Sequence, residues 1–159
     1  MNTRTMVMNA AVAAVYAALT LALAPVSYGP IQVRLSEWMT LLAFVNPRLV
    51  PGLVIGCALA NLASPFGVVD IIVGTTATFI AVYGMRFVPN LYVASLLPVI
   101  SNGIIIGLEL AYLGALDGMA LPLVMAYIAL GEAIAVSVIG IIVIRLLWRS
   151  DTIRHYLDV

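Results

Sequence analysis

Long apolar runs follow one another along almost the whole of this chain, and they limit its fold more than any other feature. Of 159 residues, 64% are hydrophobic and 9% are charged, against about 25% charged in soluble domains. A run of about 17 to 25 apolar residues is long enough to cross a lipid bilayer as a helix. The sequence therefore predicts an all-α integral membrane protein, built as a single domain over residues 1–159.

Proline, glycine, asparagine and charged residues divide these runs into six expected transmembrane helices. The second is the shortest, so we expect it to tilt or to lie partly in the membrane interface. The first is too long for the apolar core of a signal peptide, so we expect it to be retained as a span. The six helices are expected at residues 5–24, 34–46, 48–63, 69–87, 91–113 and 120–148.

The arginines indicate how these helices are oriented. With the N-terminus inside, every arginine except Arg34 falls on the cytoplasmic side, which is the positive-inside pattern. Removing one helix would put Arg48 or Arg86 on the wrong side. We therefore expect a multi-pass protein of the cell membrane with both termini in the cytoplasm. The arginines expected inside are Arg4, Arg48, Arg86, Arg145, Arg149 and Arg154.

Several chemistries lack the residues that they need. The chain has no lysine, which excludes a Walker A loop, so ATP hydrolysis would have to come from another subunit. One cysteine, Cys57, and one histidine, His155, allow neither an internal disulfide nor a histidine-rich metal site. Neither an HExxH nor a GxSxG motif occurs. We predict no catalytic residues, no metal site and no cofactor bound by this chain.

Acidic and amide side chains within the apolar helices mark the candidate site. An ionisable group at mid-helix costs at least about 2.5 to 3.5 kcal/mol in a bilayer, so it normally faces a partner or a cavity. Glu132 has no basic residue nearby in sequence, and Asn102 is expected at a similar depth. The polar groups converge in the outer half, which predicts a pocket open to the exterior beneath the 25–33 loop. The candidate residues are Glu132, Asn102, Glu109, Asn61, Asp70 and Glu37, with Tyr127, Trp38, Tyr16, Tyr28 and Tyr112 as possible aromatic walls.

Structural roles are the alternatives for some of these residues. Glu37 lies three residues after Arg34, which suits a local ion pair. Asp70 suits a helix cap, and the two asparagines suit hydrogen bonds between helices. Glu132 is the least explained by structure alone, so we expect it to serve a ligand or a proton.

Small residues recur at every fourth position on the first and third expected helices. Such stripes let helix backbones approach closely in a membrane. They predict either packing within the bundle or docking onto a partner subunit. The stripes are Ala10, Ala14 and Ala18 on the first helix and Gly52, Gly56 and Ala60 on the third.

The run GPIQVRLSEWMTLLAFVNPRLVPGLVIGCALANLASPFGVVDIIVGT, with LPVISNGIIIGLEL and YIALGE farther along, closely resembles the QueT family of queuosine-precursor transporters. The RLSE, NP, ANL-SP and D-G segments together make the resemblance specific, and it covers nearly the whole chain. Members of this family are substrate-binding S components of energy-coupling factor (ECF) transporters. The resemblance implies a six-helix ECF S-component bundle that captures its ligand from outside. The implied partners are a transmembrane scaffold subunit and two ATPase subunits, which use ATP.

The implied ligand is a 7-deazaguanine such as preQ0, preQ1 or queuine. A carboxylate can accept hydrogen bonds from the guanine-like N1–H and exocyclic amine, and an asparagine amide can donate to the carbonyl. The candidates are Glu132 or Glu109 for the first role, Asn102 or Asn61 for the second, and Glu37 or Asp70 for an aminomethyl group.

The resemblance also implies that an Ala-xxx-Ala stripe on the first helix docks onto the scaffold. Ala10, Ala14 and Ala18 have this spacing, but Ala13 and Ala17 have it too, so the register stays open. An S component for another vitamin is one alternative function. An autonomous facilitator or proton-coupled carrier is another, and an intramembrane enzyme or a purely structural subunit fits less well.

Overall fold

The computed structural model describes residues 2–27 and 33–151, and every element within these ranges is helical. This confirms the all-helical prediction. Four helices are long and apolar enough to cross a membrane, and two shorter apolar helices accompany them, so a count of six spans stays a prediction. The long helices are Thr3–Ala22, Val68–Phe87, Leu91–Tyr112 and Leu121–Leu147; the shorter ones are Leu35–Val45 and Pro47–Asn61.

Four of these helices contain 3₁₀ or π turns, since η2 (Pro47–Leu49) opens Pro47–Asn61 and η3 (Met85–Phe87) closes Val68–Phe87. The helix Leu35–Val45 begins as the 3₁₀ helix η1, and Leu121–Leu147 contains the π-helix η4. Asn90 is the N-cap of α6 (Leu91–Tyr112). Its side-chain Oδ1 accepts a hydrogen bond from the Val93 amide at 3.0 Å. In chain order the elements are α1 (Thr3–Ala22), α2 (Ala24–Ser27), η1 (Leu35–Leu41), α3 (Leu42–Val45), η2 (Pro47–Leu49), α4 (Val50–Asn61), α5 (Val68–Gly84), η3 (Met85–Phe87), α6 (Leu91–Tyr112), α7 (Leu121–Glu132), η4 (Ala133–Gly140) and α8 (Ile141–Leu147).

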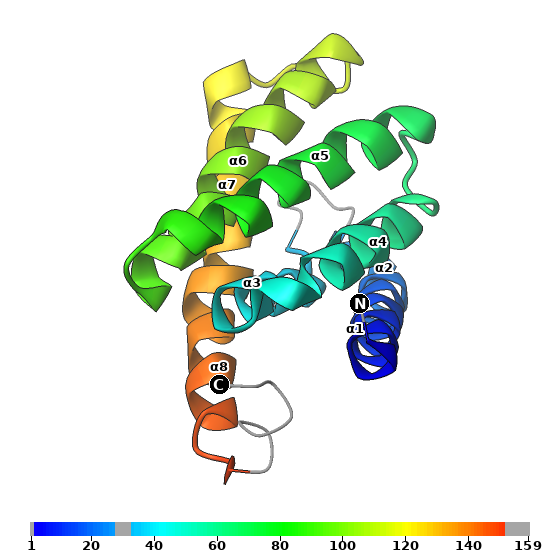
Figure 1. The fold of residues 1–159 in the computed structure, drawn as a ribbon. Helices are drawn as coiled ribbons and strands as arrows, with labels where there is room; N and C mark the ends of the chain where they lie inside the picture. Colours follow the sequence, from blue (N-terminus) through cyan, green and yellow to red (C-terminus); the bar gives the residue numbers. More distant parts are fainter. Residues whose placement is uncertain (1, 28–32, 152–159) are drawn as a thin grey trace.

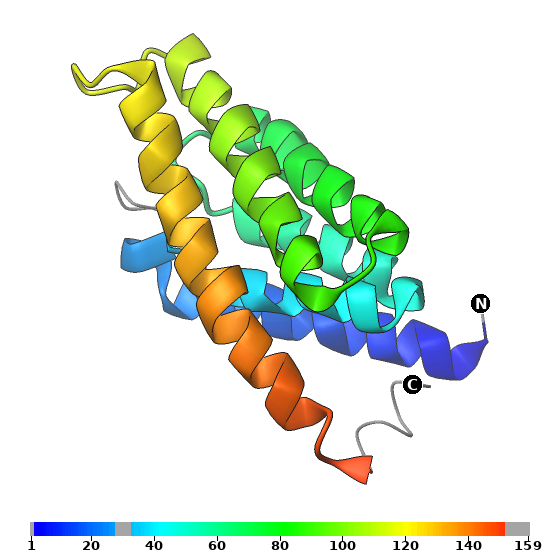
Figure 2. The same ribbon diagram turned by 90° about the vertical axis from the view of Figure 1, so that its left-hand side faces the viewer.

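The helices form a closed bundle around η1. The helix α1 packs on α4, although α2, η1, α3 and η2 lie between them in the chain, and α4 packs on α5, α5 on α6 and α6 on α7 (Figure 1). The circuit closes where η1 packs against both η4 and α1. In Figure 2 the elements α7, η4 and α8 form one continuous column that crosses the other helices. This arrangement places η1 in contact with α1, α5, α6 and η4 at once.

Glycines allow α1 and α4 to approach closely. A Cβ atom at Gly52 would lie 2.6 Å from the Asn9 backbone oxygen, and one at Gly56 would lie 2.9 Å from the Tyr16 Cβ. The Asn9 side chain of α1 also stabilises this contact by two hydrogen bonds. Its Oδ1 accepts from the Gly52 amide at 2.6 Å, and its Nδ2 donates to the Arg48 carbonyl at 2.9 Å. The small-residue stripe of the third expected helix therefore packs within the bundle.

Replacing Gly52 with alanine is expected to lower the free energy of unfolding by about 1 to 3 kcal/mol, because the new methyl group meets backbone that cannot yield. The free energy can be measured by SDS titration in mixed micelles. Gly84→Ala is the control, since its Cβ would meet only the Leu97 Cδ1 atom, at 3.3 Å. Equal stability of the two variants would contradict the prediction.

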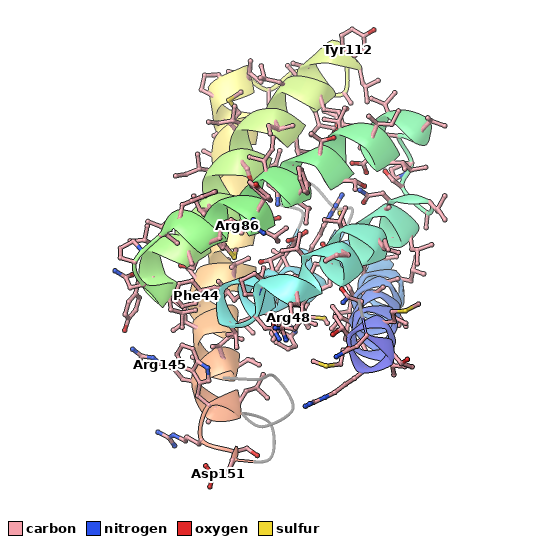
Figure 3. All side chains as sticks on the ribbon, in the orientation of Figure 1. Phe44, Arg48, Arg86, Tyr112, Arg145 and Asp151 are labelled. Atoms are coloured by element: carbon pink, nitrogen blue, oxygen red, sulfur yellow. The ribbon has the colours of Figure 1, made fainter. Side chains whose placement is uncertain are left out.

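Arginines gather at one end of the bundle. Arg48 and Arg86 line the same hollow of about 520 Å³, together with Asn2 and Thr5. Arg145 lies over the ring of Tyr92 at the start of α6, with 5.3 Å between the guanidinium carbon and the ring centroid. Figure 3 shows Tyr112 at the opposite end from Arg145 and Asp151. This grouping is what the positive-inside pattern needs, although Arg154 lies outside the described residues and the cytoplasmic orientation stays a prediction.

Candidate functional site

A buried arginine joins three elements at the end of the bundle opposite to Arg48 and Arg86. Arg34 precedes η1 and donates from Nη1 to Asn61 Oδ1 at 3.0 Å and from Nη2 to Asp70 Oδ2 at 3.4 Å. Asn61 Nδ2 in turn donates to the Asp70 backbone oxygen at 3.1 Å. Arg34 is only 6% exposed, and both of its partners are buried. The end of α4, the start of α5 and the start of η1 are therefore held together by one polar cluster.

Gly74 makes room for this cluster on α5. It lies one helical turn after Asp70, and a Cβ atom there would sit 2.7 Å from both Asn61 Nδ2 and Asp70 Oδ1. Real Cβ atoms do not approach polar atoms so closely. Asn61 and Asp70 can therefore meet only because residue 74 has no side chain.

A second set of polar contacts ties η1 to α1. Tyr16 donates its hydroxyl proton to Glu37 Oε1, and the hydroxyl groups of Thr20 and Ser36 lie 2.6 Å apart. All four side chains are buried. Since η1 sits at the centre of the bundle, these contacts place the Glu37 carboxylate in the protein interior.

Asn102 of α6 and Glu132 of α7 lie side by side. Their contact agrees with the similar depth that the sequence predicts for them. Asn102 Nδ2 donates to Glu132 Oε1 at 2.9 Å, and both side chains are buried. Glu132 is the last residue of α7, and the π-helix η4 begins at the next residue. Short π-helical segments occur frequently at functional sites.

In the part of the chain that the structure describes, five buried carboxylate oxygens have no hydrogen-bond partner. Glu109 of α6 has both oxygens in this state, and it is 5% exposed. The charges of Asp70 and Arg34 act on Glu109, and those of Glu37 and Arg34 act on Glu132; we call these five residues the polar core. An unpartnered buried acceptor is costly and calls for an explanation. The five atoms are Glu37 Oε2, Asp70 Oδ1, Glu109 Oε1, Glu109 Oε2 and Glu132 Oε2.

This core is suited to bind a hydrogen-bond donor. Its spare groups are mainly carboxylate oxygens, which accept hydrogen bonds when ionised. In residues 2–27 and 33–151 no group of three or more histidine, cysteine or acidic side chains is arranged to hold a metal ion. Carboxylate oxygens without a partner suit a ligand that carries N–H groups.

The chain is similar to proteins of one known family over most of its length. Residues 6–149 match the family described as QueT transporter, which is most of the chain. The chain belongs to the QueT transporter family. A curated relative, the queuosine precursor transporter QueT of Lactococcus lactis subsp. cremoris, is 44% identical over 73 residues, which are 45% of this chain and 43% of that protein. No solved structure matches the chain.

Membership of the QueT family places the chain among proteins described as transporters. Together with its several apolar helices, it also supports a multi-pass membrane protein. The matched stretch covers less than half of the length of the curated relative. For this chain we therefore propose the substrate, the partners and the energy source.

Not every expected site residue contacts this core. Trp38 packs partly against the larger apolar cluster, where its Cα and Cβ face Gly140. Tyr127 is partly exposed on α7, and Tyr112 is 85% exposed. Tyr28 and most of the expected 25–33 lid lie outside the described residues. Roles for Trp38 and Tyr127 as pocket walls stay predictions.

Burial differs between the two alanine stripes on α1. Ala13 and Ala17 are buried, and Ala13 packs against Gly56 of α4. Ala10, Ala14 and Ala18 are exposed. A groove of about 440 Å³ runs between α1 and α4 on this side. It is lined by Met6, Asn9, Ala10, Ala13, Ala14, Pro51, Ile55 and Leu59.

Sequence reasoning missed several residues of the site. Tyr16 was expected only as an aromatic wall, and Thr20, Ser36 and Gly74 were not expected at the site. Two signals were present in the sequence. Arg34 is the one arginine placed outside by the topology, which indicates a specific partner, and Gly74 follows Asp70 by one turn.

Proposed function

We propose that this chain is the substrate-binding S component of an ECF-type importer, and that it captures a 7-deazaguanine queuosine precursor from outside the cell. Its family membership and the name of its curated relative support a queuosine precursor as ligand. The lack of lysine, and so of a Walker A loop, is consistent with ATP hydrolysis by partner subunits. In this proposal the chain binds no cofactor itself, and both termini lie in the cytoplasm.

The observation that carries the ligand assignment is the buried pair of Asn102 and Glu132. Glu132 Oε2 has no partner, so it can accept from the N1–H or the exocyclic amine of a guanine-like edge. Asn102 Nδ2 uses one of its two protons on Glu132 and keeps the other for the carbonyl oxygen of the base. The pair thus offers acceptors and a donor in the order that a guanine edge requires.

The exposed alanines on α1 supply the proposed docking face. Ala10, Ala14 and Ala18 are exposed although they lie on a long apolar helix, and Ala10 and Ala14 line the groove beside α4. A small-residue face lets a partner helix approach its backbone closely. We assign this face to the scaffold subunit, which with two ATPase subunits would complete the importer.

Replacing Ala14 with leucine is expected to lower ATP-driven uptake by roughly tenfold, because the larger side chain holds the scaffold helix away. Uptake of a labelled 7-deazaguanine is measured in liposomes that contain this chain and the three partner subunits. Binding to the isolated chain should not change. Ala126→Leu, at an exposed position on α7, is the control and should leave uptake unaltered.

Two outcomes would contradict this proposal. Full uptake by the Ala14→Leu variant would remove the docking role of α1. Uptake by the wild-type chain alone, without ATPase subunits, would favour an autonomous facilitator or a proton-coupled carrier. Mass spectrometry of small molecules that copurify with the chain tests the ligand, since a vitamin unlike a purine would make this an S component of another kind.

A further inference from the structure

Glu109 is a buried acid whose carboxylate takes part in none of the hydrogen bonds of the polar core. It lies on α6, seven residues after Asn102, so both side chains project from the same face of the helix, about 10.5 Å apart along its axis. Both of its carboxylate oxygens are buried and unpartnered. Glu109 therefore stands two turns beyond the pair of Asn102 and Glu132, with two acceptors available.

The polar core contains more acidic than basic groups. Its four acids are all buried, and among the described residues Arg34 is the only buried basic side chain. The guanidinium of Arg34 is hydrogen-bonded to Asp70 and Asn61. The core is therefore short of positive charge. The four acids are Glu37, Asp70, Glu109 and Glu132.

An organic cation would balance this core better than a neutral ligand. Burying a carboxylate without a partner is costly, and a hydrogen-bonded positive charge removes much of that cost. A protonated amine carries several N–H donors and so can occupy both oxygens of Glu109. Arg34 does not fill this place in the structure, since it donates to Asp70 and Asn61 while neither oxygen of Glu109 has a hydrogen-bond partner.

Building on the proposed function, we propose that Glu109 binds the protonated amine on the side arm of the precursor. The guanine-like edge would face Asn102 and Glu132, and the arm would extend along α6 toward Glu109. The chain would then select 7-deazaguanines that carry an aminomethyl arm over the neutral analogue that carries a nitrile at the same position. Selectivity between the two would depend on the charge of one side chain.

The test measures dissociation constants of the purified full-length chain for the aminomethyl and the nitrile 7-deazaguanine. Wild type is expected to bind the aminomethyl compound at least about tenfold more tightly, as a charge-assisted hydrogen bond implies. Glu109→Gln should lose this preference by weakening the aminomethyl compound alone, with nitrile binding within about threefold of wild type. Asp117→Asn, which removes an exposed acid from the loop after α6, should keep the preference.

Other results of these binding measurements would count against the role of Glu109 or against the proposed function. Equal binding of the two compounds by wild type, or an unchanged preference in Glu109→Gln, would overturn the role of Glu109 and leave the proposed function intact. Failure of wild type to bind either compound would overturn the role of Glu109, and failure to bind queuine as well would overturn the proposed function. If Glu109→Gln does not fold, Glu109→Asp retains the charge on a shorter arm. A reduced preference in that variant supports the role, and a preference equal to wild type counts against it.

Discussion

Glu132→Gln is expected to bind a 7-deazaguanine roughly 10- to 100-fold more weakly than wild type, the range set by losing a hydrogen bond to a charged group. The glutamine can still accept from Asn102 Nδ2 through its carbonyl oxygen. Its amide nitrogen would then replace Oε2 and turn N–H donors toward the donors of the ligand. Isothermal titration of the purified chain measures the change.

Folding and binding should separate in this variant. A buried neutral amide costs less than a buried carboxylate with an unpartnered oxygen, so empty Glu132→Gln should be at least as stable as wild type. Asp117→Asn again serves as the matched control, because it removes an acid from an exposed loop. If Glu132→Gln bound the ligand as tightly as wild type, Glu132 would have no part in base recognition.

The helical segments were largely predictable because apolar runs and helix breakers are local features of the sequence. The run expected at 91–113 appears as Leu91–Tyr112, with Asn90 as its cap. The short second segment, expected at 34–46, appears as Leu35–Val45. Its first part is a 3₁₀ helix, which rises about 2.0 Å per residue in place of 1.5 Å and so covers more depth than its length suggests.

The partners within the core were less predictable, because they depend on how distant helices pack. The sequence predicted only a similar depth for Asn102 and Glu132, and the structure adds the contact between them. For Arg34 the sequence suggested a local pair with Glu37. The backbone at Arg34 is extended, and the side chain reaches Asp70, 36 residues away in sequence. Glu37 accepts instead from Tyr16 of α1, a contact that needs η1 at the centre of the bundle.

Arg34→Met is expected to lower the free energy of unfolding by about 3 to 5 kcal/mol, the usual cost of breaking a buried ion pair from one side. The variant would leave Asp70 buried with an uncompensated charge and Asn61 Oδ1 without this donor. SDS titration in mixed micelles measures the change. Arg149→Met, at an exposed position after α8, should alter stability by no more than about 0.5 kcal/mol.

A double variant separates the charge of Arg34 from its packing. Asp70→Asn removes the stranded charge while it keeps the shape that Gly74 accommodates, so Arg34→Met/Asp70→Asn should be more stable than Arg34→Met alone. Residues that share an ion pair typically couple by about 0.5 to 3 kcal/mol in such a cycle. Additive effects would mean that Arg34 stabilises the core through its contacts with other groups. Strong coupling would mean that Arg34 neutralises Asp70, which leaves the remaining acids of the core to be balanced by a ligand or by protons.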